Sequence, residues 1–585
     1  MKNFVIAALI GIAAATVFSA AVGFGLVNLD DYIYVESHPE VKGGLTLAGV
    51  KWAFTWIGDA MWTPLTWISY MADQSIGWGA AGMHGVGVVL QGLNAALLFL
   101  FLVSLFRGSE TLTSGKGGVT IVAALAALLW AVHPLRVESV VWIASRKDMI
   151  STFFFLLALI AWTKGRTLGL VAAILLMTIG GLAKSSVMIF PAFAIGIDII
   201  LARRKPWWAY GVIVLLSLGF AVESGWAQQH GGAMDPGVIP RWFGLVNAAS
   251  SLTIYAGNVL WPHDLAVECI LRYPSLPRWS PIGLLAIIAF GYWGYGLARR
   301  IWEDRGIAKC RDEVACFGGV LLFFAGLVPF LGLVPFGLHA FADRFTVLPG
   351  IGLSLAAVAG WRWFVASGPG RGTRAALLSG GAVAVVALGL VAVRQTAFCR
   401  DDVTLFSRTV AVDGECNLVA KHILALHAWE FDHDMEKVYT HLSALFKSAP
   451  WIAEQYGSTV PFFIEAAYET GHVAEADDAF IWICKWDGRQ IEQARREGNL
   501  LLQTTMPYLF AEAIRLAYKD GLLDEAEKKL AKIQELKPNN FMTLDIAHLI
   551  ARRSGDAGRI AETREACTNV VGETYCLNRW ASKKE

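Results

Sequence analysis

The sequence predicts an all-α protein, a polytopic membrane helical bundle of about eleven spans followed by a water-soluble α-solenoid domain. Hydrophobic residues make up 55% of the 585-residue chain and charged residues only 17%, with a mean hydropathy of +0.50. Soluble domains carry roughly 25% charged residues. Charge is sparse before about residue 395 and frequent after it, which divides the chain into a membrane domain, 1–395, and an aqueous domain, 396–585. The net charge of +1 gives no reason to expect a nucleic-acid partner.

Apolar segments long enough to cross a bilayer recur through the membrane domain. A hydrocarbon core of ~30 Å requires about 20 apolar residues in a helix. The first segment follows a single Lys and exceeds the length of a signal-peptide core, so we interpret it as a retained helix. The eleven predicted spans are 4–27, 82–106, 118–133, 149–163, 167–183, 186–202, 207–222, 281–299, 315–335, 346–364 and 375–394.

Basic loops predict the orientation of these helices, because Lys and Arg gather at cytoplasmic helix ends. With the N-terminus inside, all five basic loops are cytoplasmic, provided that the more polar segment 243–262 does not cross. We therefore interpret 243–262 as re-entrant or interfacial. The odd number of crossings then places the aqueous domain outside, in the periplasm if the membrane is a bacterial inner membrane, as we expect.

Five basic residues contradict this charge rule, because they lie at the outer ends of predicted spans. They are Arg136, Arg146, Lys147, Lys184 and Arg344. Charged groups at membrane depth are costly and usually face an internal cavity, where an anionic phosphate would compensate them. The alternative is that each long side chain extends to the membrane surface.

The first outer loop, 28–80, opens with the carboxylate pair Asp30 and Asp31. Like charges close together raise one pKa, which produces a base able to accept a proton from a hydroxyl. The alternative is a solvated turn or a helix cap.

Seven stretches in the membrane domain carry a family resemblance. They are NLDDYIYV (28–35), WTPLTWISYMAD (62–73), HGVGVVLQGLNAALLF (84–99), HPLRVESVVWIASRKD (133–148), GLAKSSVMIFP (181–191), WPHDLAV (261–267) and HAFADRFTVLPGIGL (339–353). In this order they resemble the GT-C superfamily of polyprenyl-phosphate-sugar glycosyltransferases, and within it the transmembrane and tetratricopeptide-repeat-containing, protein O-mannosyltransferase-like group. Thr63, Gln91, Ser185 and Ser186 depart from the pattern expected of that group.

The resemblance implies transfer of a sugar from a polyprenyl-phosphate carrier to a hydroxyl, expected on Ser or Thr of an exported protein, with inversion at the anomeric carbon. Asp30 or Asp31 would be the general base. The phosphate would be held by Lys184 and Arg344 first, and by Arg146 and Lys147 next. Residues expected to bind or orient substrate are His84, His133, Arg136, Glu138, Asp148 and Asp343.

Two of these assignments have structural alternatives. His133 precedes Pro134, so it could instead end a helix with its imidazole satisfied by the backbone. The tryptophans of the first outer loop could stack on sugar rings, but anchoring in the membrane interface is the more common role; they are Trp52, Trp56, Trp62, Trp67 and Trp78. No local spacing of His or Cys predicts a metal site, so no cofactor is predicted, although the acidic pair leaves a divalent ion possible.

The aqueous domain shows amphipathic helices separated by short turns. Residues 510–540 resemble the helix-turn-helix unit of a tetratricopeptide repeat, whose period is about 34 residues, and degraded units follow this pattern at 462–488 and 541–567. Stacked units form a concave surface that would recruit a protein acceptor, whereas the alternative is a structural cap. Cys399 with Cys416 and Cys567 with Cys576 are plausible disulfides in an oxidising compartment, which leaves Cys484 over.

Two other functional classes fit a polytopic chain, a membrane transporter and a non-catalytic binding scaffold. Transporters commonly contain inverted repeats with broken helices, and the sequence shows no such symmetry. The retained acidic and basic motifs argue against a degenerate scaffold. Neither the sugar, the carrier lipid nor the acceptor, which could also be a lipid or a glycan, follows from the sequence.

Overall fold

The computed structural model forms two compact units, Met1–Leu405 and Phe406–Glu585. Regular structure is almost entirely helical; the exception among the described residues is the antiparallel pair β1 (Cys269–Ile270) and β2 (His339–Phe341). The structure describes residues 1–58, 61–106, 118–200, 203–230, 241–267, 269–270, 280–303, 310–333, 339–413, 417–448, 459–496, 505–519, 521–538 and 540–570.

Among its described residues, the first unit contains six helices long and apolar enough to cross a membrane. They are α1 with η1 (Lys2–Gly23), α6 (Gly79–Phe106), α12 (Trp207–His230), α14 (Ser280–Glu303), α15 with η6 (Arg311–Phe330) and α17 (Arg371–Ala397). A seventh is possible, because α7 (Gly118–Ala131) continues after a 55° bend into Pro134–Val141, which comprises η2 (Pro134–Arg136) and α8 (Val137–Val141). These helices indicate an integral membrane protein.

The prediction of eleven crossings is not confirmed by length and composition alone. The remaining predicted spans form shorter helices or carry charges at their ends: α9 (Arg146–Lys164), α10 (Thr167–Ala183), η4 (Ser185–Ile189), α11 (Phe190–Ile200) and α16 (Gly350–Ala366). The predicted interfacial segment 243–262 forms α13 (Arg241–Leu260), which is not among the six long apolar helices.

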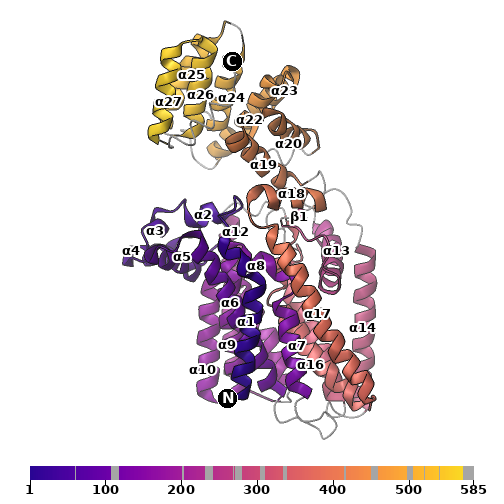
Figure 1. The fold of residues 1–585 in the computed structure, drawn as a ribbon. Helices are drawn as coiled ribbons and strands as arrows, with labels where there is room; N and C mark the ends of the chain where they lie inside the picture. Colours follow the sequence, from indigo (N-terminus) through magenta and orange to yellow (C-terminus); the bar gives the residue numbers. More distant parts are fainter. Residues whose placement is uncertain are drawn as a thin grey trace. The chain divides into compact units, whose positions relative to one another are not determined.

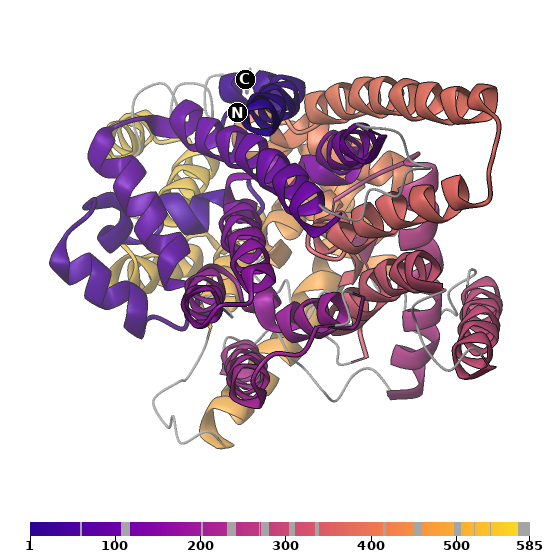
Figure 2. The same ribbon diagram turned by 90° about the horizontal axis from the view of Figure 1, so that it is seen from below.

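Small residues bring the helices of this unit into close contact, as is common in membranes. A Cβ atom added to Gly11 of α1 would lie 2.8 Å from the carbonyl oxygen of Gly92 on α6. The same holds for α15 and α16, where a Cβ on Gly319 would lie 2.6 Å from the carbonyl oxygen of Gly352. Figure 2 looks along the bundle, with several of its helices seen end-on.

Short helices form the end of the bundle opposite the N-terminus (Figure 1). They include α2 (Asp31–Val35), α3 (Pro39–Lys42), α4 (Leu47–Thr55) and α5 (Pro64–Ile76). Proline at the first position starts α3 and α5, where its missing N–H costs no hydrogen bond.

Aromatic side chains hold these short helices together. Trp52, Trp56 and Trp67 surround the His38 ring with centroid distances of 5.2, 5.2 and 5.1 Å. Trp78, at the end of the same loop, is exposed. Three of the five predicted interfacial tryptophans therefore pack against one another in this aromatic cluster.

The second unit consists of helices that pair with their neighbours. It contains most of α18 (Asp402–Asp413), α19 (Leu418–His427), η8 (Ala428–Asp432), α20 (Met435–Ser448), α22 (Val460–Glu469), α23 (Val473–Arg496), α24 (Met506–Tyr518), α25 (Leu523–Leu536), α26 (Phe541–Ser554) and α27 (Ala557–Val570). Three hairpins, α22–α23, α24–α25 and α26–α27, turn at Gly471, Gly521 and Gly555, each with positive φ. The spacing of Gly521 and Gly555 matches a period of about 34 residues. The tetratricopeptide assignment itself stays a prediction.

The cysteines differ in part from the predicted pairs. Cys399 is a buried free thiol, so its predicted disulfide with Cys416 is wrong. Its surroundings at the end of α17 are Glu138 and Gln395, and no sequence spacing revealed that neighbourhood. Cys567 is disulfide-bonded, to a cysteine whose side chain lies outside the described part of the chain. Cys484 is free and exposed.

Candidate functional site

The two adjacent carboxylates of the first outer loop have different environments. Asp31 is fully buried; its Oδ1 accepts the backbone N–H of Ala144 at 2.8 Å and its Oδ2 that of Val27 at 3.1 Å. Burial raises the pKa of Asp31 from 3.8 to about 7, against the lowering effect of these two backbone hydrogen bonds, and the charges of Asp30 and Asp402 raise it further. Asp30 is half-buried and precedes α2, but its side chain does not cap that helix. Asp31 is therefore an anchor, and Asp30 is the more accessible carboxylate.

The ammonium of Lys147 lies against Tyr34, one helical turn after Asp31. Its Nζ donates to the Tyr34 Oη at 3.0 Å and lies 4.6 Å from the centre of that ring. The Tyr34 ring stacks on Trp67 of α5 with a centroid distance of 4.7 Å and an interplanar angle of 13°. The charges of Asp30, Asp31, Asp148 and Arg344 all act on Lys147. The acidic pair of the first outer loop and the basic residues of later loops thus belong to one cluster.

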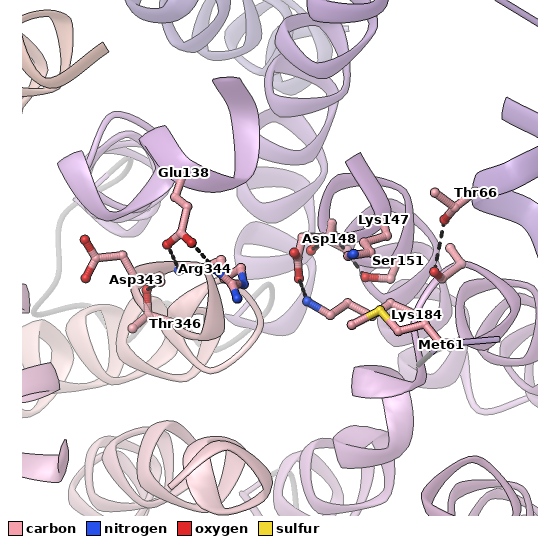
Figure 3. Close-up of polar contacts among 12 residues, drawn as sticks. Met61, Thr66, Glu138, Lys147, Asp148, Ser151, Lys184, Asp343, Arg344 and Thr346 are labelled. Atoms are coloured by element: carbon pink, nitrogen blue, oxygen red, sulfur yellow. Dashed lines mark hydrogen bonds and ion pairs between the residues drawn. The ribbon is translucent and has the colours of Figure 1, made fainter. Parts of the chain in front are cut away.

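Two buried ion pairs complete this cluster (Figure 3). Lys184 Nζ contacts Asp148 Oδ1 at 2.6 Å. The Arg344 guanidinium pairs with Glu138 Oε1, and its backbone N–H donates to Glu138 Oε2 at 3.0 Å. One aromatic ring, Phe345, lies 5.7 Å from the Lys184 ammonium and 5.1 Å from the Arg344 guanidinium carbon. The two cations predicted as first phosphate ligands are thus neighbours, and each has a carboxylate partner.

Arg136 and Asp343 connect to the same group. The Arg136 side chain is buried and donates to the hydroxyl of Thr346 in η7 (Asp343–Thr346), while its Nε and Nη1 have no hydrogen-bond partner among the described atoms. Asp343 is buried and accepts from Asn258 at 3.4 Å. Burial and the nearby Glu138 carboxylate raise the pKa of Asp343 to about 8. A largely protonated Asp343 can therefore donate a hydrogen bond at neutral pH.

Arg146 has a different environment from its neighbour Lys147. It pairs with Asp73 of α5, donates to the carbonyl of Met83 at 2.9 Å and lies over the Tyr70 ring. With only 1% of its surface exposed, Arg146 joins α5, α6 and α9. These contacts give it a structural environment rather than a free phosphate-binding face.

Both histidines predicted to bind substrate are engaged with the backbone. The ring nitrogens of His84 contact the carbonyls of Val141 at 2.8 Å and Gly25 at 3.1 Å. His133 contacts the Val259 carbonyl through Nε2 at 3.0 Å, and its Nδ1 accepts a backbone N–H two residues later. A single neutral tautomer satisfies His133. This geometry is the helix-terminating alternative considered for His133 from the sequence.

Sequence reasoning missed two residues that contact the adjacent cations Arg146 and Lys147, namely Asp73 and Tyr34. Both lie inside motifs that were recognised, and Tyr34 stands three residues after Asp31, which puts the two on one face of a helix. That spacing was an available signal for Tyr34. No sequence signal pointed to Asp73, because its partner Arg146 is distant in the sequence and only the packing of α5 against α9 brings the two together.

The donor set does not suit a divalent cation. In the part of the chain that the structure describes, no group of three or more His, Cys, Asp or Glu side chains could hold a metal ion. Asp31 uses both oxygens for backbone N–H groups, and the nearby acids Asp148 and Glu138 each face a cation. No step is therefore assigned to a metal.

A short part of the chain is similar to known glycosyltransferases. It is 32% identical over 106 residues to the protein O-mannosyl-transferase TMTC4 of Homo sapiens, which is 17% of this chain and 14% of the relative. The mouse protein of the same name is 31% identical over 105 residues, again 14% of its length. No family model and no solved structure matches the chain. The similarity supports a membrane glycosyltransferase in general terms.

Proposed function

We propose that this protein transfers a sugar from a polyprenyl-phosphate carrier to a Ser or Thr hydroxyl of an exported protein, with inversion at the anomeric carbon. The observation that carries the proposal is the joining of the acidic turn at Asp30 and Asp31 to the cation Lys147, through the Asp31–Ala144 and Tyr34–Lys147 hydrogen bonds. Such transfer needs a base for the acceptor hydroxyl and cations for the departing phosphate. The similarity to an O-mannosyl-transferase agrees with this chemistry.

Asp30 is the base in this proposal. A general base must reach the proton that it abstracts, so geometry takes precedence over pKa. Both oxygens of Asp31 are occupied by backbone donors and the side chain has no exposed surface. Asp30 directly precedes Asp31 on the same turn, is half-buried and leaves its helix uncapped. Asp31 then acts as the positioning residue.

The phosphate is held by Lys147, Lys184 and Arg344. Negative charge develops on the phosphate oxygens as the sugar leaves, and preorganised cations in a buried site stabilise that charge strongly. Asp148 and Glu138 keep Lys184 and Arg344 in place before the donor arrives. Asp343, held protonated by burial, is suited to donate to a sugar hydroxyl.

Membrane placement follows from the same proposal. The acidic turn of the cluster starts α2, one of the short helices opposite the N-terminus (Figure 1). We assign this end of the bundle to the outer face of a bacterial inner membrane crossed eleven times. The second unit would be periplasmic, and its helical hairpins would present a tetratricopeptide-like surface to the acceptor protein.

Mass spectrometry of exported proteins tests this function. Cells lacking the gene should lose hexose-sized adducts on Ser or Thr, and the wild-type gene should restore them. Asp30→Asn should fail to restore them although the protein accumulates in the membrane. Glu36→Gln is the matched control, because Glu36 is an exposed acid of the same loop. Identical adducts with and without the gene would refute the proposal.

A further inference from the structure

The Tyr34 side chain is fixed on several sides. Its ring stacks on Trp67, meets the edge of Tyr70 at a centroid distance of 6.0 Å, and is itself buried. Trp67 is itself 1% exposed and packs against His38 and Trp52 of the aromatic cluster, so the ring on which Tyr34 stacks is also fixed. The phenol oxygen therefore has a defined position between α5 and α9.

Lys147 differs from Lys184 and Arg344 in its partner. Lys184 and Arg344 each contact a carboxylate, whereas the Lys147 ammonium donates to a neutral phenol. A buried cation that no carboxylate contacts is only partly compensated by more distant charges such as Asp30 and Asp148, and this favours binding of an anion. An ammonium carries three N–H donors, so one hydrogen bond to Tyr34 leaves two for phosphate oxygens.

A lysine alone holds such a geometry poorly. Its four-carbon stem is flexible and loses rotamer freedom when it is fixed. The rigid phenol supplies both a hydrogen-bond acceptor at 3.0 Å and a ring face at 4.6 Å. Both contacts restrict the ammonium to one place before the donor binds.

We propose that Tyr34 is a positioning residue that holds the Lys147 ammonium ready for the phosphate of the polyprenyl-phosphate donor. This inference rests on the proposed function and adds a residue to it. Tyr34 takes no part in bond making or breaking; it acts through Lys147.

A double-mutant cycle on the full-length protein in lipid nanodiscs tests this role, with polyprenyl phosphate as the binding probe. Tyr34→Phe keeps the ring stack and should weaken binding roughly 2- to 10-fold, the effect of one hydrogen bond. Lys147→Met should weaken it roughly 10- to 100-fold, as for a charged hydrogen-bonding partner. The double variant should bind like Lys147→Met, because the two residues act as a unit.

A second readout separates positioning from general stability. With polyprenyl-phosphate mannose as donor, Tyr34→Phe should raise the donor KM with little change in kcat or in Tm. Tyr210→Phe is the matched control, since its hydroxyl bonds Asp198 on a distant element. Additive losses in the double variant, or an unchanged donor KM, would overturn the role of Tyr34 in an otherwise active enzyme. A wild-type protein that neither binds polyprenyl phosphate nor transfers sugar would overturn the proposed function together with this inference.

Discussion

The Asp31 carboxylate accepts the backbone N–H of Ala144, 113 positions later in the chain, at 2.8 Å. Ala144 belongs to η3 (Ile143–Ser145), which directly precedes α9, the helix that carries Lys147 as its second residue. One buried hydrogen bond thus joins the acidic turn to the segment that carries the cations. In the proposed function, the relative placement of the base and the phosphate site depends on this contact.

The pH dependence of stability should reveal Asp31. Its pKa is about 7 in the folded protein and ordinarily 3.8, so between these pH values the folded state retains a proton that the unfolded chain has already lost. The stability contributed by protonated Asp31 is complete below about pH 4 and is lost as the pH rises through 7. Between pH 4 and pH 7 the free energy of unfolding of the wild type should fall by up to about 4 kcal/mol relative to that of Asp31→Asn, because each pKa unit corresponds to about 1.4 kcal/mol. Thermal unfolding of both proteins in detergent at several pH values measures this change. A stability difference between them that stays constant with pH would contradict the raised pKa of Asp31.

Glu138 should contribute strongly to stability. Its removal in Glu138→Ala leaves the buried Arg344 guanidinium without its carboxylate, which typically costs about 3–5 kcal/mol. The double variant Glu138→Ala/Arg344→Ala removes the stranded charge and should recover part of that loss. A comparison of unfolding temperatures checks this, and a double variant less stable than the single one would argue against a buried pair.

Arg146 and Lys147 are adjacent basic residues with different expected phenotypes. Arg146→Met strands the Asp73 carboxylate, so it should mainly lower the unfolding temperature. Lys147→Met should mainly weaken polyprenyl phosphate binding, because its partner is a neutral phenol. The two properties are measured on the same purified samples. Equal effects of both variants on binding at equal stability would refute the distinction.

Close packing of α1 against α6 should make Gly92 intolerant of a side chain. Gly92→Leu places a Cβ 2.8 Å from the Gly11 carbonyl oxygen and should abolish the monodisperse fraction in detergent. Gly85→Leu, on the same helix, meets nothing within 4 Å and should be tolerated. Comparable yields of the two variants would show that the helices do not pack in this way.

The sequence predicted the features that depend on composition and local spacing. Apolar runs predicted α1, α6 and α17, and basic residues against the charge rule identified Lys184 and Arg344, which lie beside one ring. These signals are local to each segment.

Pairings between distant segments were not predictable from one sequence. The partners of Arg146 and Lys147 are Asp73 and Tyr34, and only the packing of the first outer loop against α9 brings them together. The buried thiol of Cys399 was missed for the same reason, because residues from several elements enclose it.

Sugar transfer by the reconstituted protein tests the central claim most directly. Wild-type protein in liposomes, supplied with polyprenyl-phosphate mannose and an exported acceptor protein, should release polyprenyl phosphate and form an O-linked product. Asp30→Asn should reduce the rate by roughly 10²- to 10⁴-fold, the usual contribution of a general base, at an unchanged unfolding temperature. Transfer by Asp30→Asn at the wild-type rate would contradict the account.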